Sequence, residues 1–401
     1  MPWLTIFGLF LSTAVFLGAV PFGEDAGLWF AFLALVVGVS SFLGSILFLG
    51  ALLGPLTKVE TEIGPTYLLR SSWQYRFLKN VLFFFPWFSF LLPAGVILGF
   101  TSSLPLFLIW VVAFGIYLDA LRWGWQWGEE LLNPETMIQQ LLHRAKWAIQ
   151  NEKDEVLWSS LDGMGEVALK AIQQHHLSLC SHAIDGFPSL VSIFFASSKS
   201  ISRKPMDDEI QKETGSDEAS YTLFYLLQRL QWIYQKAVLL SMEAVGIHLI
   251  RVLGKITISC MQFDFSLVAP PLRFLSRFGV QAERVGWEDA SRLAVSTLLE
   301  LAKKMVEDFD VRWSGLQEPF FALIQGLDDL ARTAFQKDRS TTISLLLSPF
   351  FSIQNILKQD RLAGQVEIPA IQAKLDTVIT QFQTLEQLLR HPQSPQAKAG
   401  E

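Results

Sequence analysis

Residues 28–55 read LWFAFLALVVGVSSFLGSILFLGALLGP and contain no Asp, Glu, Lys or Arg. A helix needs about 20 apolar residues to cross a hydrocarbon core roughly 30 Å thick. This stretch is therefore long enough to span a membrane and to tilt or project beyond it. It predicts a transmembrane helix, and the sequence on both sides has a similar composition.

The first 121 residues hold only nine charged side chains, and these lie almost entirely between apolar runs. Three further runs approach the length of a membrane span, namely residues 3–20, 80–100 and 104–121. A signal peptide is the alternative for the first run, but no Lys or Arg precedes it and a poor cleavage site follows it. Residues 1–129 are thus predicted to form a four-span transmembrane domain.

Basic residues are distributed unevenly among the connections between these spans. The first connection carries Glu24 and Asp25 without Lys or Arg, the second carries four basic residues, and the third carries no charge. Basic residues return after the fourth span. Because Lys and Arg near span ends favour the cytoplasmic side, we expect both termini in the cytoplasm. The absence of a signal peptide and of Asn-x-Ser/Thr acceptors fits a bacterial inner cell membrane.

Aromatic residues follow the fourth predicted span directly. Trp123, Trp125 and Trp127 lie where an indole ring can occupy the headgroup zone while its N–H stays hydrated. We interpret them as a membrane-interface belt. A platform that stacks against a ligand is the alternative interpretation of three tryptophans in five residues.

The connection before the third span combines apolar and basic residues. Residues 65–79 include Arg70, Arg76 and Lys79 among Tyr, Leu, Trp and Phe. This composition predicts an interfacial helix on the inner leaflet, or else a cytoplasmic extension of the third span.

Small residues recur along the second span, including Gly44, Gly50 and Gly54. Small residues four positions apart let membrane helices approach closely, so we expect these glycines in helix packing. A pore lining is the alternative.

The remainder of the chain has a different composition. Beyond position 121 it carries 28 basic and 33 acidic residues, a net charge of −5. Such a balance does not suggest nucleic-acid binding, which favours a basic face. Two cysteines give no disulfide framework. We predict that residues 130–390 form an all-α, solenoid-like repeat domain.

Short blocks of sequence recur within this domain. Residues 141–147 match 226–232, residues 160–165 match 241–246, and residues 163–168 match 326–331. Each copy is followed by a proline that precedes an apolar run, namely Pro188, Pro271 and Pro349. Proline suits the first turn of a helix, so we expect a return helix to start near each one. Chance similarity among Leu-rich helices is the alternative.

These blocks predict three repeated units, bounded by polar segments. The units are residues 133–196, 220–280 and 287–358, with a terminal cap helix at 368–390. In the first unit Asn133 fits an N-cap, and Pro134 fits the first helical position. We expect a mobile loop at residues 197–219 and a disordered tail at residues 391–401, from their polar composition.

One cluster has the residue types of a metal site. His175, His176, Cys180 and His182 lie close together in sequence and could offer zinc nitrogen and sulfur donors. The repeat alignment places Met261 opposite Cys180, which favours a buried core thiol instead. Metal binding is therefore the weaker hypothesis, and we expect no cofactor.

No catalytic constellation is recognisable. Neither a Walker A run nor a His-Glu-x-x-His or Gly-x-Ser-x-Gly motif is present. The preferred hypothesis is a non-enzymatic multi-pass membrane protein that presents a cytoplasmic helical-repeat scaffold to a protein partner. The alternative is a subunit of a homo-oligomeric channel or transporter, and the least favoured is a metal-dependent membrane enzyme.

Overall fold

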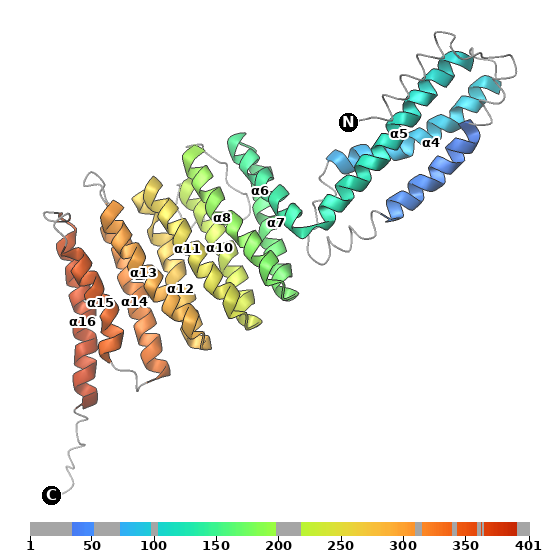
Figure 1. Cartoon of the computed structure of the whole chain (residues 1–401). Coiled ribbons are helices and arrows are strands. Elements are labelled where there is room, and N and C mark those ends of the chain that lie inside the picture. Colours follow the sequence, from blue (N-terminus) through green and yellow to red (C-terminus); the bar gives the residue numbers. More distant parts are fainter. Residues whose placement is uncertain are drawn as a thin grey trace, which may run out of the picture. The chain divides into compact units, whose positions relative to one another are not determined.

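The computed structural model describes residues 34–51, 73–97, 103–197, 218–308, 315–338, 343–358, 362 and 365–390. Within these residues every regular element is a helix, which confirms the all-α prediction there. The chain divides into two compact units, Met1–Met137 and Ile138–Glu401. Each unit is described separately below (Figure 1).

The first unit contains the helix Ala34–Ala51, α4 (Trp73–Ile97) and α5 (Ser103–Leu132). A buried cluster that includes Leu78, Leu82 and Phe85 lies between them. The Tyr117 hydroxyl of α5 donates a hydrogen bond to the Ser41 carbonyl oxygen at 3.0 Å and lies 3.0 Å from the Ser45 hydroxyl. These contacts join α5 to the Ala34–Ala51 helix through small polar residues.

The predicted spans fall on these helices where the structure describes them. The run at 28–55 contains the Ala34–Ala51 helix, most of the run at 80–100 lies in α4, and the run at 104–121 lies in α5. The run at 3–20 lies outside the described residues. Residues 73–79 of the predicted interfacial segment belong to α4 itself, and residues 65–72 are outside the described part.

Four helices in the described part of the chain are long and apolar enough to cross a membrane. Ala34–Ala51 and Leu108–Gly128 belong to the first unit, where 22% and 28% of their residues are buried. Leu177–Ser197 and Glu243–Phe263 belong to the second unit, where 56% and 61% are buried. The apolar composition of the last two is explained by a protein core, because neighbouring helices already cover much of their surface.

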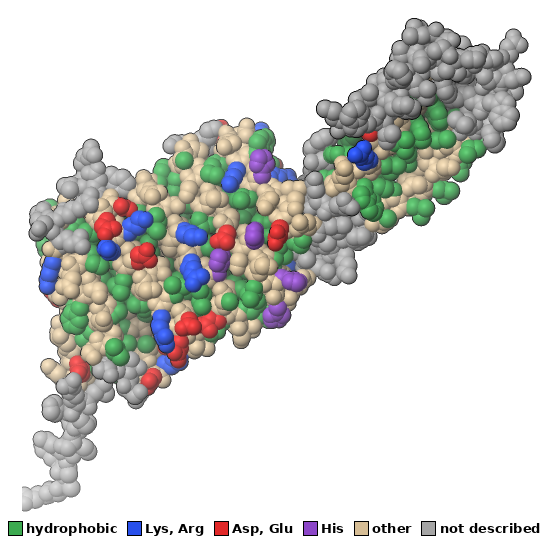
Figure 2. All heavy atoms as spheres, in the orientation of Figure 1, with side chains coloured by type: hydrophobic (Ala, Val, Ile, Leu, Met, Phe, Trp, Pro, Cys, Tyr) green, Lys and Arg blue, Asp and Glu red, His purple; other side chains and the backbone are tan. Residues whose placement is uncertain are grey.

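The described surfaces of the two units differ in their content of hydrophobic and charged side chains. On the face in view, hydrophobic side chains dominate the first unit, whereas charged and histidine side chains are spread over the second (Figure 2). Leu43, Leu47 and Phe84 of the first unit are 56%, 72% and 65% exposed. Large apolar patches on a protein surface indicate contact with a membrane or another protein.

The second unit is a stack of antiparallel helices (Figure 1). The elements are α6 (Pro134–Gln150), α7 (Asp154–Gln173), α8 (Leu177–Ser197), α10 (Glu218–Leu239), α11 (Glu243–Phe263), the 3-10 turn η1 (Phe265–Leu267), α12 (Ala269–Val285), α13 (Glu288–Asp308), α14 (Gln317–Lys337), α15 (Ile343–Leu357) and α16 (Ile368–Arg390). The N-cap prediction for α6 is confirmed, because Asn133 Oδ1 accepts a hydrogen bond from the Glu135 amide at 3.0 Å.

Contacts between helices define two layers. One layer runs through α7, α10, α12, α14 and α16, each packed against the next in that order. The other runs through α8, α11, α13 and α15 in the same way. Consecutive helices from α7 onward therefore belong alternately to the two layers and form pairs, as in a two-layer solenoid. The boundaries of the three repeat units predicted from the sequence do not coincide with these helix pairs, and the units stay a prediction.

A common turn joins several consecutive helices. After the turn, an amide N–H bonds an alanine carbonyl oxygen five positions earlier at 2.9–3.0 Å: Lys153 to Ala148, His176 to Ala171, Met242 to Ala237 and Trp287 to Ala282. The preceding residue has a positive φ in each case: Glu152, His175, Ser241 and Gly286. This is the Schellman arrangement, which ends a helix and reverses the chain within a few residues.

Two of the three prolines do not lie where the sequence predicted them. Pro271 does lie in the first turn of α12. Pro188 and Pro349 instead lie inside α8 and α15, so the prediction of helices starting near them is wrong. The physical reason is that both helices begin earlier with strongly apolar residues, whose burial outweighs the hydrogen bond that an internal proline removes.

Two predicted segments lie mainly outside the described part. Residues 198–217 of the predicted loop and the tail at 391–401 are not described, and the ends of the loop segment belong to α8 and α10.

A substitution at Gly326 can test the contact between α12 and α14. An alanine Cβ there would overlap the Ser276 hydroxyl and lie 2.6 Å from Ser276 Cβ. We expect Gly326→Ala to lower the free energy of unfolding by about 1–3 kcal/mol through overpacking. Thermal or denaturant unfolding of the full-length protein in detergent measures the change.

Gly165→Ala is the matched control, because its nearest neighbour, Arg229 Cδ, would be at an ordinary 3.8 Å. We expect this change to be neutral or slightly stabilising, since alanine favours helix more than glycine does. A Ser276→Gly change combined with Gly326→Ala should recover stability relative to Gly326→Ala. Equal effects of the two glycine changes would contradict the proposed contact.

Candidate functional site

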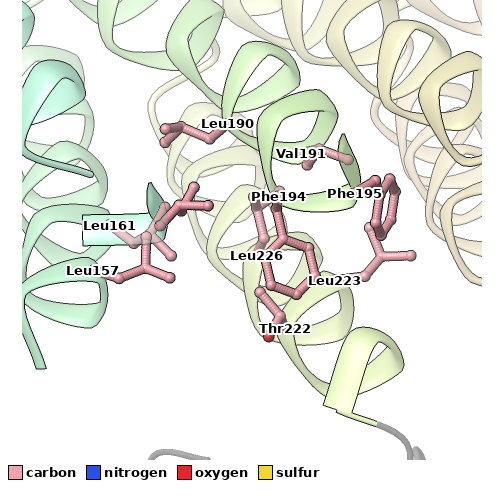
Figure 3. A pocket seen from close by; sticks show the side chains of 10 residues that line it. Leu157, Leu161, Leu190, Val191, Phe194, Phe195, Thr222, Leu223 and Leu226 are labelled. Atoms are coloured by element: carbon pink, nitrogen blue, oxygen red, sulfur yellow. The ribbon is translucent and has the colours of Figure 1, made fainter. Parts of the chain in front are cut away.

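An apolar pocket lies between α6, α7, α8 and α10 (Figure 3). In Figure 3, Leu157 and Leu161 face Phe194 and Leu226 across the pocket, and Thr222 lies at its edge. The Thr222 hydroxyl is buried without a hydrogen-bond partner. The cavity volume is about 20 Å³, which holds at most one water, and a water needs two to four polar partners. The pocket is therefore a packing void and not a ligand site.

A larger groove runs between α12 and α14 of the second unit. Its volume is about 920 Å³, within the range of ligand sites, and polar side chains contribute much of its lining. The lining residues are Arg273, Ser276, Arg277, Val280, Gln281, Arg284 and Val285 of α12, and Ala322, Gln325, Gly326, Asp329, Arg332, Thr333 and Gln336 of α14. On each helix these positions recur every three or four residues, so they share one face.

Small residues bring the two helices together beneath the groove. Gly326 of α14 meets Ser276 of α12 so closely that a Cβ at position 326 would overlap its side chain. Gly279 similarly approaches Leu330, whose Cδ2 would lie 3.0 Å from an added Cβ. Ser276 is 6% exposed, and its hydroxyl has no hydrogen-bond partner among the described residues. The close approach leaves the longer polar side chains to form the walls.

Two of the four arginines in the groove have acidic partners. Arg273 lies 2.9 Å from Glu318, and Arg332 lies 2.7 Å from Asp328. Arg332 also donates to Gln381 of α16 at 2.7 Å. These contacts hold two guanidinium groups at the groove by ion pairs that are mostly exposed and individually weak.

The other two arginines lack such partners. Neither Arg277 nor Arg284 has a carboxylate within 4.0 Å among the residues that the structure describes. Both side chains are exposed, and the Arg277 guanidinium lies 5.3 Å from the centre of the Phe274 ring. Two arginines on one helix face thus offer positive charge to the groove, and Asp329 of the lining balances it in part.

One carboxylate of the groove has a perturbed pKa. Partial burial raises the pKa of Asp329 above its ordinary value, and the charge of Asp328 raises it further. Arg332 and Arg284 act in the opposite direction. Folding therefore disfavours the ionised form of Asp329. As the pH rises from the ordinary aspartate pKa through the raised pKa, ionisation of this group lowers the free energy of unfolding.

A second charged cluster joins α7 to α10. Arg229 Nη2 lies 2.5 Å from Asp162 Oδ1 and donates to the Tyr225 hydroxyl at 2.7 Å, and Tyr225 donates to the same carboxylate. The Arg229 guanidinium also lies 4.5 Å from the centre of the Trp232 ring. These contacts link two helices as a structural network does, although the Arg229 Nε atom is buried without a hydrogen-bond partner among the described residues.

The structure does not bring the predicted metal ligands together. His175, His176 and His182 are exposed, whereas Cys180 is fully buried. No group of three or more His, Cys, Asp or Glu side chains within the described ranges could hold a metal ion. Burial raises the pKa of the Cys180 thiol to about 12, as expected for a thiol inside a core.

The predicted interface residues lie on α4 and α5. Trp127 is buried, Trp123 is half-buried with its ring 6.1 Å from that of Phe77, and Trp125 is 49% exposed. Arg76 and Lys79 are exposed on α4, and Arg70 lies outside the described residues.

The predicted packing glycines have different surroundings. A Cβ at Gly44 would lie 3.8 Å from the Tyr117 hydroxyl, so this position faces α5. A Cβ at Gly50 would meet nothing within 4 Å in the described structure. Gly54 lies outside it.

The groove was missed at the sequence level. Its signal was the spacing of Arg273, Arg277 and Arg284, which places three guanidinium groups on one helix face. The net negative charge of the whole domain concealed this local basic stripe. Only the packing of α12 against α14 shows that the stripe lines a groove.

No protein-family model and no curated protein matches the chain. Among solved structures, a "Circular tandem repeat protein with novel repeat topology and enhanced subunit contact surfaces" aligns with 92% of this chain and 100% of its own length. The two sequences are 16% identical over that alignment, and the TM-score is 0.20. A similarity of this size says nothing about the function of this chain.

The two thiols give a test of the metal hypothesis. Cys180 and Cys260 are both buried, and burial raises both thiol pKa values. We expect neither to react with a thiol reagent at about pH 8 in the folded full-length protein, and both to react after denaturation. Absorbance of the released thiolate counts the reactive groups.

A chelator is the control for that experiment. A core thiol stays unreactive after chelation, whereas a metal-held thiol becomes reactive once its metal is removed. Labelling of Cys180 in the folded protein after chelation would support the metal site.

Proposed function

We propose that this protein is a multi-pass protein of the cell (inner) membrane whose cytoplasmic helical-repeat domain serves as a scaffold for a protein partner. Its role is binding and not catalysis. The observation that carries the proposal is the arginine-lined groove between α12 and α14, present in the same chain as helices with a broad exposed apolar surface.

The membrane part of the proposal is supported by exposure and by charge. The Ala34–Ala51 and Leu108–Gly128 helices are apolar, and little of their surface is covered within the protein. In water such a surface would be unfavourable by about 25 cal/mol for each Å² left uncovered. The distribution of Lys and Arg between the spans favours cytoplasmic termini.

The scaffold part is supported by the form of the second unit. Stacked helices in two layers present long surfaces that commonly bind other proteins. The groove between α12 and α14 is a hollow on this surface, and Arg277 and Arg284 in its lining have no carboxylate within 4.0 Å among the described residues.

Membrane topology can be tested with fusions at the C-terminus. In bacterial cells we expect a C-terminal green fluorescent protein to fluoresce and a C-terminal alkaline phosphatase to be inactive, because the C-terminus stays in the cytoplasm. The protein should also remain in the membrane fraction after an alkaline wash. Release by the wash, or an active phosphatase fusion, would contradict this part of the proposal.

Partner binding can be tested by photo-crosslinking in cells. A photoreactive residue at Gln325, in the groove, should capture a specific protein that mass spectrometry identifies repeatedly. The same residue at Glu300, exposed on α13 in the other layer, is the matched control. Repeated crosslinks only between copies of this chain would instead favour the homo-oligomeric channel or transporter.

A further inference from the structure

We propose that the groove between α12 and α14 binds an extended acidic peptide segment of the partner protein, with Arg277 and Arg284 each engaging one carboxylate. This inference rests on the proposed scaffold function and names the chemistry of its partner. It is carried by the charge of the groove, the spacing of its unpaired arginines and the polar groups around them.

The charge of the groove favours an anion. Its lining contains four arginines and one aspartate, and two of the arginines are already balanced by Glu318 and Asp328. Arg277 and Arg284 have no carboxylate within 4.0 Å among the described residues. Guanidinium groups bind carboxylates through paired N–H donors, and such charge-assisted hydrogen bonds are stronger than neutral ones.

The spacing of these arginines favours a segment with two carboxylates over a single small anion. They are seven residues apart on α12, and a rise of 1.5 Å per residue separates them by about 10 Å along the helix axis. In an extended polyproline II chain, which has three residues per turn and a rise of 3.1 Å per residue, side chains three residues apart lie on one face about 9 Å apart. One phosphate group is too small to bridge that distance, whereas two acidic side chains of one peptide can.

The rest of the lining suits a peptide backbone. Gln281, Gln325 and Gln336 each carry an amide that both donates and accepts hydrogen bonds. An extended segment exposes unpaired N–H and C=O groups along its length, and these amides can satisfy them.

The Asp329 carboxylate of the groove would repel an acidic ligand. It lies in the lining beside the path of the peptide and interacts with Arg284 and Arg332. A bound acidic segment would bring further negative charge next to it. Removing the Asp329 charge should therefore strengthen binding, an effect that loss of structure cannot produce.

Fluorescence anisotropy of the full-length protein in detergent tests the proposal. The probe is a fluorescein-labelled peptide, Gly-Ser-Glu-Gly-Ser-Glu-Gly-Ser, whose two glutamates are three residues apart. We expect the double change Arg277→Gln with Arg284→Gln to weaken binding roughly tenfold or more, because two charge-assisted contacts are lost. Asp329→Asn should tighten binding, and added salt should weaken it.

The matched control removes the same charge elsewhere. Arg251 and Arg292 are exposed on α11 and α13, and their double change to Gln should alter affinity by no more than about twofold. A peptide with Gln in place of both Glu should bind more weakly, and so should one with the two Glu adjacent. Thermal unfolding establishes that each variant is folded.

Several results would overturn the inference. These are equal affinity for the groove and control variants, equal binding of the Gln peptide, no measurable binding of the Glu peptide, or displacement of the peptide by inorganic phosphate at a similar concentration. The last result would reassign the groove to a phosphate group.

The photo-crosslinking experiment separates this inference from the proposed function. If the Arg277→Gln, Arg284→Gln protein still captures the same partner in cells, the scaffold function stands and the acidic-peptide inference fails. If no partner is captured from the unmodified chain while the peptide binds with the expected variant effects, the scaffold function fails and the binding chemistry stands.

Discussion

The turn with a hydrogen bond back to an alanine carbonyl is the constraint on which the repeat unit depends. It stops a helix, reverses the chain and begins the next helix within a few residues, as between Ala148 and Lys153 or between Ala282 and Trp287. The helices that it joins are therefore antiparallel, and consecutive helices from α7 to α16 alternate between two layers. Helices that are two apart in the chain become neighbours in one layer, so α12 lies beside α14 with α13 in the other layer.

The groove follows from this alternation together with the size of a few side chains. Ser276 and Gly326 let α12 and α14 approach until their longer side chains must point outward along both edges. The arginines of α12 then face residues of α14 that are about 50 positions away in sequence. A larger residue at Gly326 would separate the two helices and change the width of the groove.

Local sequence patterns predicted those features of the structure that depend on neighbouring residues. The N-cap at Asn133, the all-α content and the apolar helices were predictable, because they depend on neighbouring residues. Pro188 and Pro349 were misinterpreted as helix starts, since proline inside a helix is tolerated where burial compensates for it. The sequence analysis placed α8 and α11 in the repeat domain, and neighbouring helices bury 56% and 61% of their residues although both are long and apolar enough to cross a membrane.

The sequence by itself determined that the described chain is helical, that its first part is unusually apolar and that its second part carries mixed charge. Helix formation and amphipathicity are encoded within a few turns, so they can be predicted from periodicity. Only the tertiary structure decided which helices share a layer, that the histidines near Cys180 are exposed, and that Arg277 and Arg284 line a groove. Those features depend on contacts between distant segments, which no local pattern specifies.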